Sequence, residues 1–208
     1  MGNLNLILFL CIMTPLAMML FVFRGDSRTV LSFLMIGIFM CLFSGEISGL
    51  LLRITGLSSY DATVHITPVV EEVLKAAPVV FFTFLFNPKR QLLLECALSV
   101  GVGFAILENA YILSGMVSQV TVGWALVRGF GAGMMHGICT LTVGYSMTFI
   151  HTKRKLFYTG SLAALSVAII YHSIYNMVIQ SPYSSAGILL PLLTYIPLIL
   201  HLKKRRTL

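Results

Sequence analysis

Thr67–Phe86 reads TPVVEEVLKAAPVVFFTFLF, an apolar stretch that holds Glu71, Glu72 and Lys75 in its first half. About 20 predominantly apolar residues are enough to cross the hydrocarbon core of a bilayer as a helix. An ionisable side chain at the middle of such a helix costs about 2.5–3.5 kcal/mol on insertion scales, and it usually belongs to a functional site. The stretch therefore predicts a membrane-spanning helix that carries chemistry.

Six further apolar runs of similar length flank this one, and they are interrupted by short polar breaks. Only 10% of the 208 residues are charged, against about 25% in an ordinary soluble domain. This composition excludes a water-soluble core, a disordered chain, a nucleic-acid-binding domain and a disulfide scaffold. We predict an all-α polytopic membrane protein with about seven spans, folded as one domain over residues 1–208. The seven predicted spans are Leu4–Phe23, Thr29–Leu52, Thr67–Phe86, Gln91–Ser114, Gly123–Ile150, Leu156–Gln180 and Ala186–Leu202.

The basic residues predict the orientation, because cytoplasmic loops of membrane proteins are enriched in Lys and Arg. With the N-terminus outside, eleven of the fourteen Lys and Arg fall on the cytoplasmic side, and only Arg53 falls in an outer loop. The other two, Lys75 and Arg128, lie within spans. We therefore predict an N-out, C-in chain whose net charge of +7 requires no acidic partner. The eleven are Arg24, Arg28, Lys89, Arg90, Lys153, Arg154, Lys155, Lys203, Lys204, Arg205 and Arg206.

Several ionisable residues inside the predicted spans fall at a similar depth, whereas Glu95 lies near the cytoplasmic end of its span. With a rise of about 1.5 Å per residue, Glu71, Glu108, His136 and His172 all fall in the outer half of the membrane, on four different spans. Random placement would scatter them. We predict that they meet in one polar pocket among spans three to six, open toward the outer face. The whole intramembrane set is Glu46, Glu71, Glu72, Lys75, Glu95, Glu108, Arg128, His136 and His172.

This set carries a surplus of negative charge, since four glutamates besides Glu95 face only Lys75 and Arg128. A site of low dielectric does not hold that surplus bare. It requires a protonated glutamic acid, protonated histidines or a bound divalent cation. Each of these suits hydrolysis by a water held between a carboxylate and an imidazole. Lys75 is four residues from Glu71 and three from Glu72, so it can bond to either carboxylate.

A structural explanation of Glu71 and Glu72 is also open. If Thr67 is the N-cap and Pro68 the first helical residue, the two acids sit near a helix start, where negative charge is favoured. That explanation does not account for the ionisable residues of the other spans.

Several known intramembrane chemistries are excluded by the residues alone. An aspartyl protease needs two membrane aspartates, but Asp26 and Asp61 both fall outside the predicted spans. The chain contains no His-Glu-x-x-His sequence of the zinc protease type. A rhomboid-type serine protease needs Gly-x-Ser at a helix start, whereas Gly56–Ser58 falls in an outer loop. A glutamate-and-histidine design remains.

Four segments, in chain order, resemble the motifs of the PrsW family of intramembrane proteases. Val70–Lys75 resembles the Glu-Glu-x-x-Lys motif, and Gly103–Asn109 is similar to the second motif nearly letter for letter. Arg128, followed eight residues later by His136 in a glycine-rich helix, resembles the third motif. His172–Asn176 resembles the fourth. The family belongs to a wider group that includes the CAAX prenyl endopeptidases and bacteriocin-processing or immunity membrane proteins.

The resemblance implies an endopeptidase that cuts a membrane-anchored protein near the extracytoplasmic face, with its motif-bearing core at about residues 67–180. The best-known family role is the first cleavage of an anti-sigma factor. The implied partner is then a single-span membrane protein, with no nucleic acid involved. The implied location is the bacterial plasma membrane, which the chain crosses several times.

As hypotheses, we assign Glu71 as the general base, with Glu72 paired to Lys75; the two glutamates can exchange these roles. His172 and Asn176 would polarise the scissile carbonyl and stabilise its oxyanion. The catalytic set is Glu71, Glu72, Glu108, His136, His172 and Asn176.

The remaining motif residues are expected to support this set. Glu108 and His136 would hold the water or a metal ion, Arg128 would neutralise a glutamate, and Asn109 would support Glu108. The mechanism can be written with or without a metal, and zinc suits mixed histidine and carboxylate ligands. The predicted ligands are Glu108, His136 and His172, and the supporting residues are Lys75, Asn109 and Arg128.

Two other functional classes stay open at this point. Buried acids and histidines also build proton relays, so a proton- or ion-coupled transporter is one alternative. The other is a membrane binding or immunity protein that keeps the protease fold without its activity.

Overall fold

The computed structural model describes residues 2–116, 121–150 and 153–204, and in these residues the chain is helical and contains no strand. The all-α prediction is confirmed, and the seven predicted runs fit seven long helices of the described chain. The first helix ends at Met19 rather than Phe23, and a short 3₁₀ turn, η3 (Ser184–Ile188), precedes the last one. The long helices are α1 (Gly2–Met19), α2 (Gly25–Thr55), α4 (Thr67–Phe86), α5 (Arg90–Met116), α6 (Val122–Ile150), α7 (Phe157–Ile179) and α8 (Leu189–Lys204).

Three helices in the described part of the chain, α2, α5 and α7, are each long and apolar enough to cross a membrane. The helix α4 is long and largely apolar as well, but it contains Glu71, Glu72 and Lys75. A helix with three charged residues needs polar partners wherever it is excluded from water. The position of α4 within the bundle provides them.

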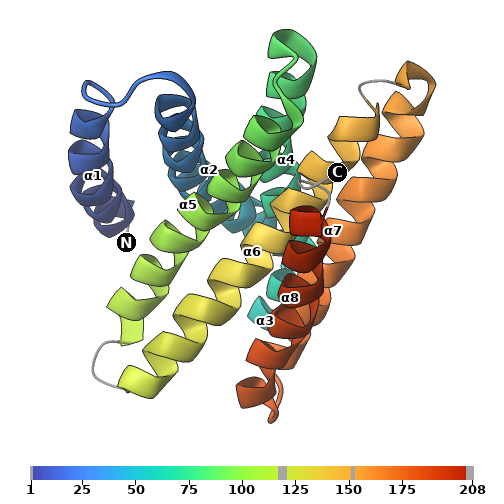
Figure 1. Ribbon diagram of the computed structural model, residues 1–208. Helices are drawn as coiled ribbons and strands as arrows, with labels where there is room; N and C mark the ends of the chain where they lie inside the picture. Colours follow the sequence, from blue (N-terminus) through green and yellow to red (C-terminus); the bar gives the residue numbers. More distant parts are fainter. Residues whose placement is uncertain (1, 117–120, 151–152, 205–208) are drawn as a thin grey trace.

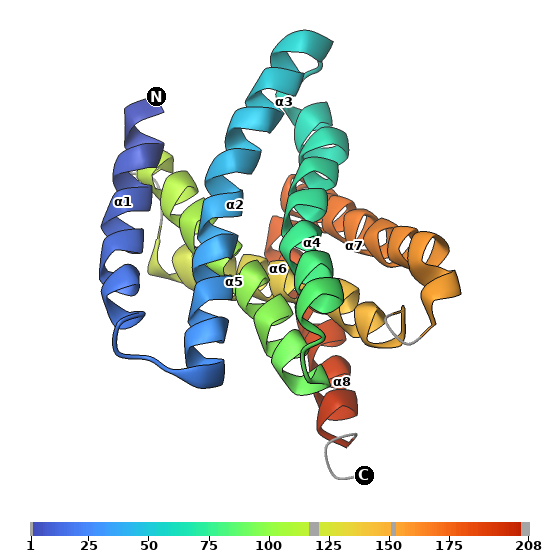
Figure 2. The same cartoon turned by 90° about the horizontal axis from the view of Figure 1, so that it is seen from above.

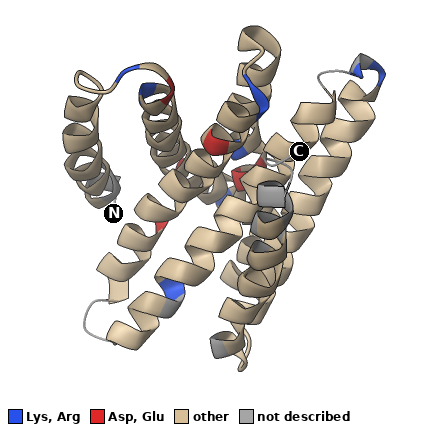
Figure 3. Cartoon of the chain, viewed as in Figure 1, with Lys and Arg blue, Asp and Glu red and all other residues tan. Residues whose placement is uncertain are grey.

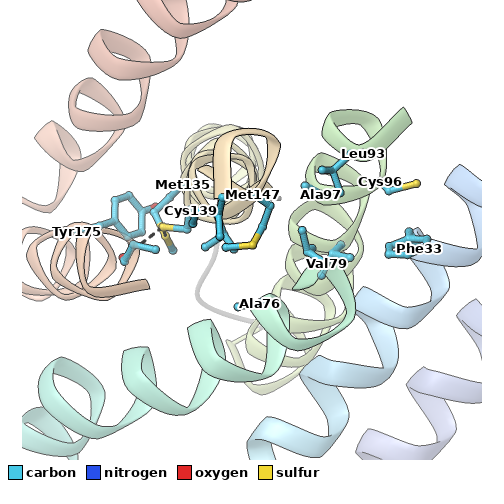
Figure 4. Close-up of a cluster of buried hydrophobic side chains, with 14 residues drawn as sticks. Phe33, Ala76, Val79, Leu93, Cys96, Ala97, Met135, Cys139, Met147 and Tyr175 are labelled. Atoms are coloured by element: carbon cyan, nitrogen blue, oxygen red, sulfur yellow. Dashed lines mark hydrogen bonds between the residues drawn. The ribbon is translucent and has the colours of Figure 1, made fainter. Parts of the chain in front are cut away.

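α4 occupies the middle of the bundle, where it contacts α2, α5, α6 and α7 (Figures 1 and 2). α1 lies at one edge beside α2, and α8 packs against α6. The apolar part of the interior gathers around the second half of α4, with Val79 between Ala97 of α5 and Phe33 of α2, and Met147 of α6 nearby (Figure 4). The core is therefore polar around the first half of α4 and apolar around its second half.

The loops that the sequence places in the cytoplasm lie at one end of the bundle. Figure 3 shows the Lys and Arg that follow α1, α4 and α6 at this shared end. That arrangement is the one that the N-out, C-in prediction requires, although the side of the membrane stays a prediction. His151 and Thr152 of the third loop lie outside the described residues, as do Arg205 and Arg206 of the C-terminal basic cluster.

The start of α4 differs from the sequence-based interpretation. Thr67 was a candidate N-cap, but its φ of −55° and ψ of −47° are helical, so the chain is already wound before this residue. Helical winding begins at α3 (Ser59–Asp61), where Ser58 is the cap and its Oγ accepts a hydrogen bond from the Asp61 N–H at 3.1 Å. Glu71 and Glu72 are therefore not first-turn acids, and a helix start does not explain them.

A π-helical turn, η1 (Ala62–Ile66), joins α3 to α4. Its wide register is visible in the Thr67 N–H, which bonds to the carbonyl oxygen of Ala62 five residues earlier. The cause is Pro68, because proline has no N–H and its ring clashes with the carbonyl four residues before it. In the five-residue register, the carbonyl oxygen of Thr63 would pair with the N–H of residue 68, which does not exist. That oxygen needs another donor.

Glycines bring α5 unusually close to its neighbours. A Cβ added to Gly103 would overlap the carbonyl oxygen of Leu34 on α2, and one added to Gly101 would overlap the carbonyl oxygen of His136 on α6. Close backbone approach through small residues is typical of helix pairs in membranes. These contacts fix α5 between α2 and α6.

Candidate active site

α4 supplies three charged side chains that are almost closed to solvent. The exposed fractions of Glu71, Glu72 and Lys75 are 5%, 1% and 0%. Residues three and four apart share one face of a helix, and this face is directed at His136 of α6 and His172 of α7, which are 0% and 1% exposed. The structure thus brings together ionisable residues of the third, fifth and sixth predicted spans.

The Lys75 ammonium is the centre of this cluster. Its Nζ atom lies 2.6 Å from Oε1 of Glu72, 2.7 Å from Nδ1 of His136 and 3.9 Å from Oε2 of Glu71. It also lies 4.5 Å from the centroid of the Phe104 ring, at cation–π distance. Since the loss of hydration costs a buried ion several kcal/mol, the cluster of partners is what allows a lysine at this position.

The contact with Lys75 fixes which nitrogen of His136 carries a proton. An ammonium has three donors and no acceptor, so Nδ1 of His136 accepts from Lys75. The proton of the neutral ring is then on Nε2, which donates to Oε2 of Glu108 at 2.9 Å. Both nitrogens of His136 are therefore engaged, and the ring links α4 to α5.

His172 has the opposite arrangement. Its Nδ1 lies 2.8 Å from Oε1 of Glu72, and because an ionised carboxylate only accepts, Nδ1 carries the proton. The lone pair is left on Nε2, which lies 3.9 Å from Oε2 of Glu71. That glutamate oxygen is buried and has no hydrogen-bond partner within the described residues. The imidazole lone pair and this carboxylate oxygen are thus both free of hydrogen bonds within the described residues, and they lie close to each other.

Glu108 is held from both sides. Its second oxygen, Oε1, lies 3.2 Å from Nη2 of Arg128, so the predicted neutralisation of a glutamate by Arg128 falls on this residue. Asn109 does not contact Glu108 through a described hydrogen bond; its Oδ1 accepts from Nε of Arg128 at 3.1 Å. Asn109 therefore positions the guanidinium that pairs with Glu108.

Asn176 supplies the donor that the π-helical turn lacks. Its Nδ2 donates to the carbonyl oxygen of Thr63 at 3.0 Å, across 113 residues of sequence. This oxygen is the one that Pro68 leaves without a backbone partner. Asn176 thereby ties α7 to the segment that leads into α4, and one of its two amide hydrogens is used for this bond.

A cavity of about 350 Å³ lies between α2, the start of α4 and α5. Glu71 and Glu108 line it from α4 and α5, and Glu46 lines it from α2. Thr63 and Thr67 also line it. The volume is within the range of about 300–1,000 Å³ that is usual for ligand sites, so the cluster has a space beside it that could admit water and a peptide.

The comparison with known families covers nearly the whole chain. Residues 14–202 match the PrsW family of intramembrane metalloproteases. The chain belongs to this family. Membership identifies it as a membrane peptidase, and the resemblance seen in four sequence motifs is confirmed over a much longer stretch. No curated protein and no solved structure matches the chain.

The donor set of this PrsW family member fits a metal ion. One carboxylate and two imidazoles, from Glu71, His136 and His172, have ligand atoms within 4.8 Å of one another, and all three residues are buried. This is a ligand set used by catalytic zinc. Glu71 and His172 offer free lone pairs, whereas His136 can join only when one of its nitrogens leaves Lys75 or Glu108. The group includes two of the predicted ligands but takes Glu71 in place of Glu108, which instead bonds to His136.

The sequence did not single out two residues of the site. Phe104 lies against the Lys75 ammonium and has its ring centroid 5.0 Å from that of His136. The sequence signal for Phe104 was its position inside Gly103–Asn109, the segment that resembles the second family motif. Thr63 takes part through its backbone carbonyl, and a proline five residues later was the only sequence sign that this oxygen would lack a partner.

The Lys75–Glu72 pair yields a stability prediction. Changing Lys75→Met or Glu72→Gln should each lower the free energy of unfolding by about 3–5 kcal/mol, because each leaves a buried charge without its partner. The double variant should lose much less than the sum of the two losses. Thermal unfolding of the purified chain in detergent measures this, with Lys89→Met in an exposed loop as the control. Additive losses would show that the two residues do not act as a pair.

The hydrogen bond between Asn176 and the Thr63 carbonyl yields a second stability prediction. Asn176→Ala should cost about 1–3 kcal/mol, because the Thr63 carbonyl becomes a polar group without a donor. In a Pro68→Ala background, residue 68 gains an N–H that can bond to Thr63, so Asn176→Ala should cost distinctly less. Pro78→Ala, also within α4, is the matched control background and should change nothing. An equal cost of Asn176→Ala in all three backgrounds contradicts this account of the π-helical turn.

Proposed function

We propose that this chain is an endopeptidase that hydrolyses a peptide bond of a membrane-anchored protein near the extracytoplasmic face. The observation that carries the proposal is the pair of free atoms, Oε2 of Glu71 and Nε2 of His172, 3.9 Å apart. A single water could make hydrogen bonds of about 2.8 Å to two acceptor atoms at this separation, once the buried Oε2 of Glu71 is opened to water. Glu71 also lines the cavity from which a peptide would approach.

In this mechanism Glu71 is the general base. It takes a proton from the water as the oxygen attacks the scissile carbonyl carbon, and it returns that proton to the leaving amine. His172 orients the water, and Glu72 fixes His172 by accepting from Nδ1. Lys75, which bonds to Glu72, keeps this carboxylate from acting as the base. Of the two assignments left open by the sequence, the contacts favour Glu71 as base and Glu72 as positioning residue.

The remaining polar groups serve the transition state. Asn176 keeps a second amide hydrogen beside the one that bonds to Thr63, and we assign it to the developing oxyanion, for which one donor contributes about 3 kcal/mol. Arg128 and His136 hold Glu108 at the cavity wall. As an alternative to the metal-free water, a zinc ion held by Glu71, His136 and His172 would take the lone pairs of Glu71 and His172 and would supply a Lewis acid that polarises the carbonyl and acidifies water.

The proposed substrate is inferred from the family to which the chain belongs. We propose a single-span protein of the bacterial plasma membrane as substrate, with the first cleavage of an anti-sigma factor as the physiological reaction. The concentration of basic residues at one end of the bundle supports N-out, C-in insertion. In that orientation Glu71, near the start of an inward-running α4, is on the outer side of the membrane.

The proposal predicts which single changes abolish cleavage. Glu71→Gln, Glu108→Gln and His136→Ala should each lower the rate by at least about 10²-fold, a usual loss for a missing acid–base group, while the chain stays inserted and folded. The full-length chain in liposomes is incubated with single-span fusion proteins whose outer flanks are randomised, and mass spectrometry identifies the cut bonds. Glu95→Gln, at the other end of α5, is the matched control. Cleavage that survives two of the three changes, or is absent in the unchanged chain, refutes the proposal.

Metal content gives an independent test of the donor group. The chain purified without chelator should hold about one zinc, measured by plasma mass spectrometry. Glu71→Gln and His172→Ala should each reduce that content strongly, because both supply free lone pairs, whereas Glu95→Gln should keep it. Glu108→Gln should reduce it less than Glu71→Gln. A metal-free chain with full activity would remove zinc from the mechanism and leave the Glu71–His172 water.

A further inference from the structure

Three carboxylates line the cavity beside the cluster, and they differ in their partners. Glu108 pairs with Arg128 at 3.2 Å, and Glu71 has the Lys75 ammonium at 3.9 Å. Glu46, on α2, makes no ion pair or side-chain hydrogen bond with any residue that the structure describes. The cavity therefore presents one acid whose charge no residue in the described part of the chain balances.

The position of Glu46 is costly for a residue without a role. It lies within α2, one of the helices apolar enough to cross the membrane, and its side chain is exposed rather than packed in the core. A carboxylate inside such a span costs about 2.5–3.5 kcal/mol on insertion scales. Water in the cavity can solvate this carboxylate, but no side chain of the described residues neutralises its charge, so a cationic group of a bound ligand is its natural partner.

A second observation directs that ligand to the same cavity. Oε2 of Glu71 is buried, has no hydrogen-bond partner in the described chain and belongs to a residue that lines the cavity with Glu46. The cavity thus joins an exposed carboxylate on α2 to the residue proposed to activate water. A peptide that reaches Glu71 through this space passes Glu46.

We propose that Glu46 binds a lysine or arginine of the substrate, close in sequence to the scissile bond, and so selects which membrane proteins are cut. This inference rests on the proposed function, since it assumes that the cavity takes a substrate peptide. Lys and Arg are the side chains that reach a carboxylate through an apolar stem while keeping a fixed positive charge. The pair would balance the one unpaired acid of the cavity.

The selection would be stringent because of where it operates. The outer flanks of membrane spans carry few basic residues, so a requirement for one near the cleavage site rejects most single-span proteins. A substrate without it would leave Glu46 unpaired beside the bound peptide, and an unpaired charge is an effective element of discrimination.

A measurement of peptide binding tests the proposed role of Glu46 separately from cleavage. The full-length Glu71→Gln chain, which should not consume the probe, is placed in phosphatidylcholine nanodiscs. The probes are fluorescent single-span peptides whose outer flank is Gly and Ser with a single Lys at successive positions; the reference has Gln. One or two adjacent Lys positions should bind about tenfold more tightly than the reference, which corresponds to about 1.4 kcal/mol.

Two variants of Glu46 identify the partner. Adding Glu46→Gln should erase the preference for Lys, and Glu46→Lys should transfer it to a peptide with Glu at the same position. Glu95→Gln is the matched control and should keep the preference. If Glu71→Gln impairs folding, the same set of peptides is incubated with the unmutated chain, and the cleavage rate of each peptide is measured instead of its binding.

The outcomes separate the two proposals. If no Lys position is preferred, or if the preference survives Glu46→Gln, the inference is wrong even where the chain cleaves. If binding depends on Glu46 but the unmutated chain cuts none of the peptides, the site stands and the endopeptidase assignment fails.

Discussion

The contact between the Lys75 ammonium and the Glu72 carboxylate, 2.6 Å long and closed to solvent, supports the rest of the site. Neither ion is tolerable alone in an apolar bundle. Together they orient two imidazoles in opposite ways: Lys75 takes the lone pair of His136, and Glu72 takes the proton of His172. One histidine therefore becomes a structural link to Glu108, and the other keeps a lone pair for chemistry. The asymmetry of the site follows from one local ion pair.

A proline has a comparable influence at longer range. Pro68 removes a backbone donor and forces a π-helical turn before α4. The turn leaves the Thr63 carbonyl open to Asn176 of α7. Two helices that carry candidate catalytic residues, α4 and α7, are thus tied together at an irregular turn of the backbone. Irregular backbone of this kind is tolerated in membranes where protein groups satisfy it, and here it lies at the wall of the cavity.

The apolar surroundings give these polar contacts their strength. Gly101 and Gly103 let α5 approach α2 and α6 closely, and the packed core around Val79 excludes water from the second half of α4. Hydrogen bonds between charged groups are stronger where water is excluded. The cavity beside Glu71 provides the opposite condition at the first half of α4, where the proposed hydrolysis needs water. The helix α4 therefore combines a dry half that holds the fold with a polar half that meets the cavity.

The helices, the family and the Lys75–Glu72 pair could be predicted from the sequence, because each depends on local information. Apolar runs set the spans, and a spacing of three residues places two side chains on one helical face. The common depth of Glu71, Glu108, His136 and His172 could also be inferred, since the rise of a helix is constant. Helix rotation and crossing were not accessible, because long-range packing sets them. For that reason only the tertiary structure assigned Glu71 to the metal group, Asn109 to Arg128, Asn176 to Thr63, and the free lone pair to His172.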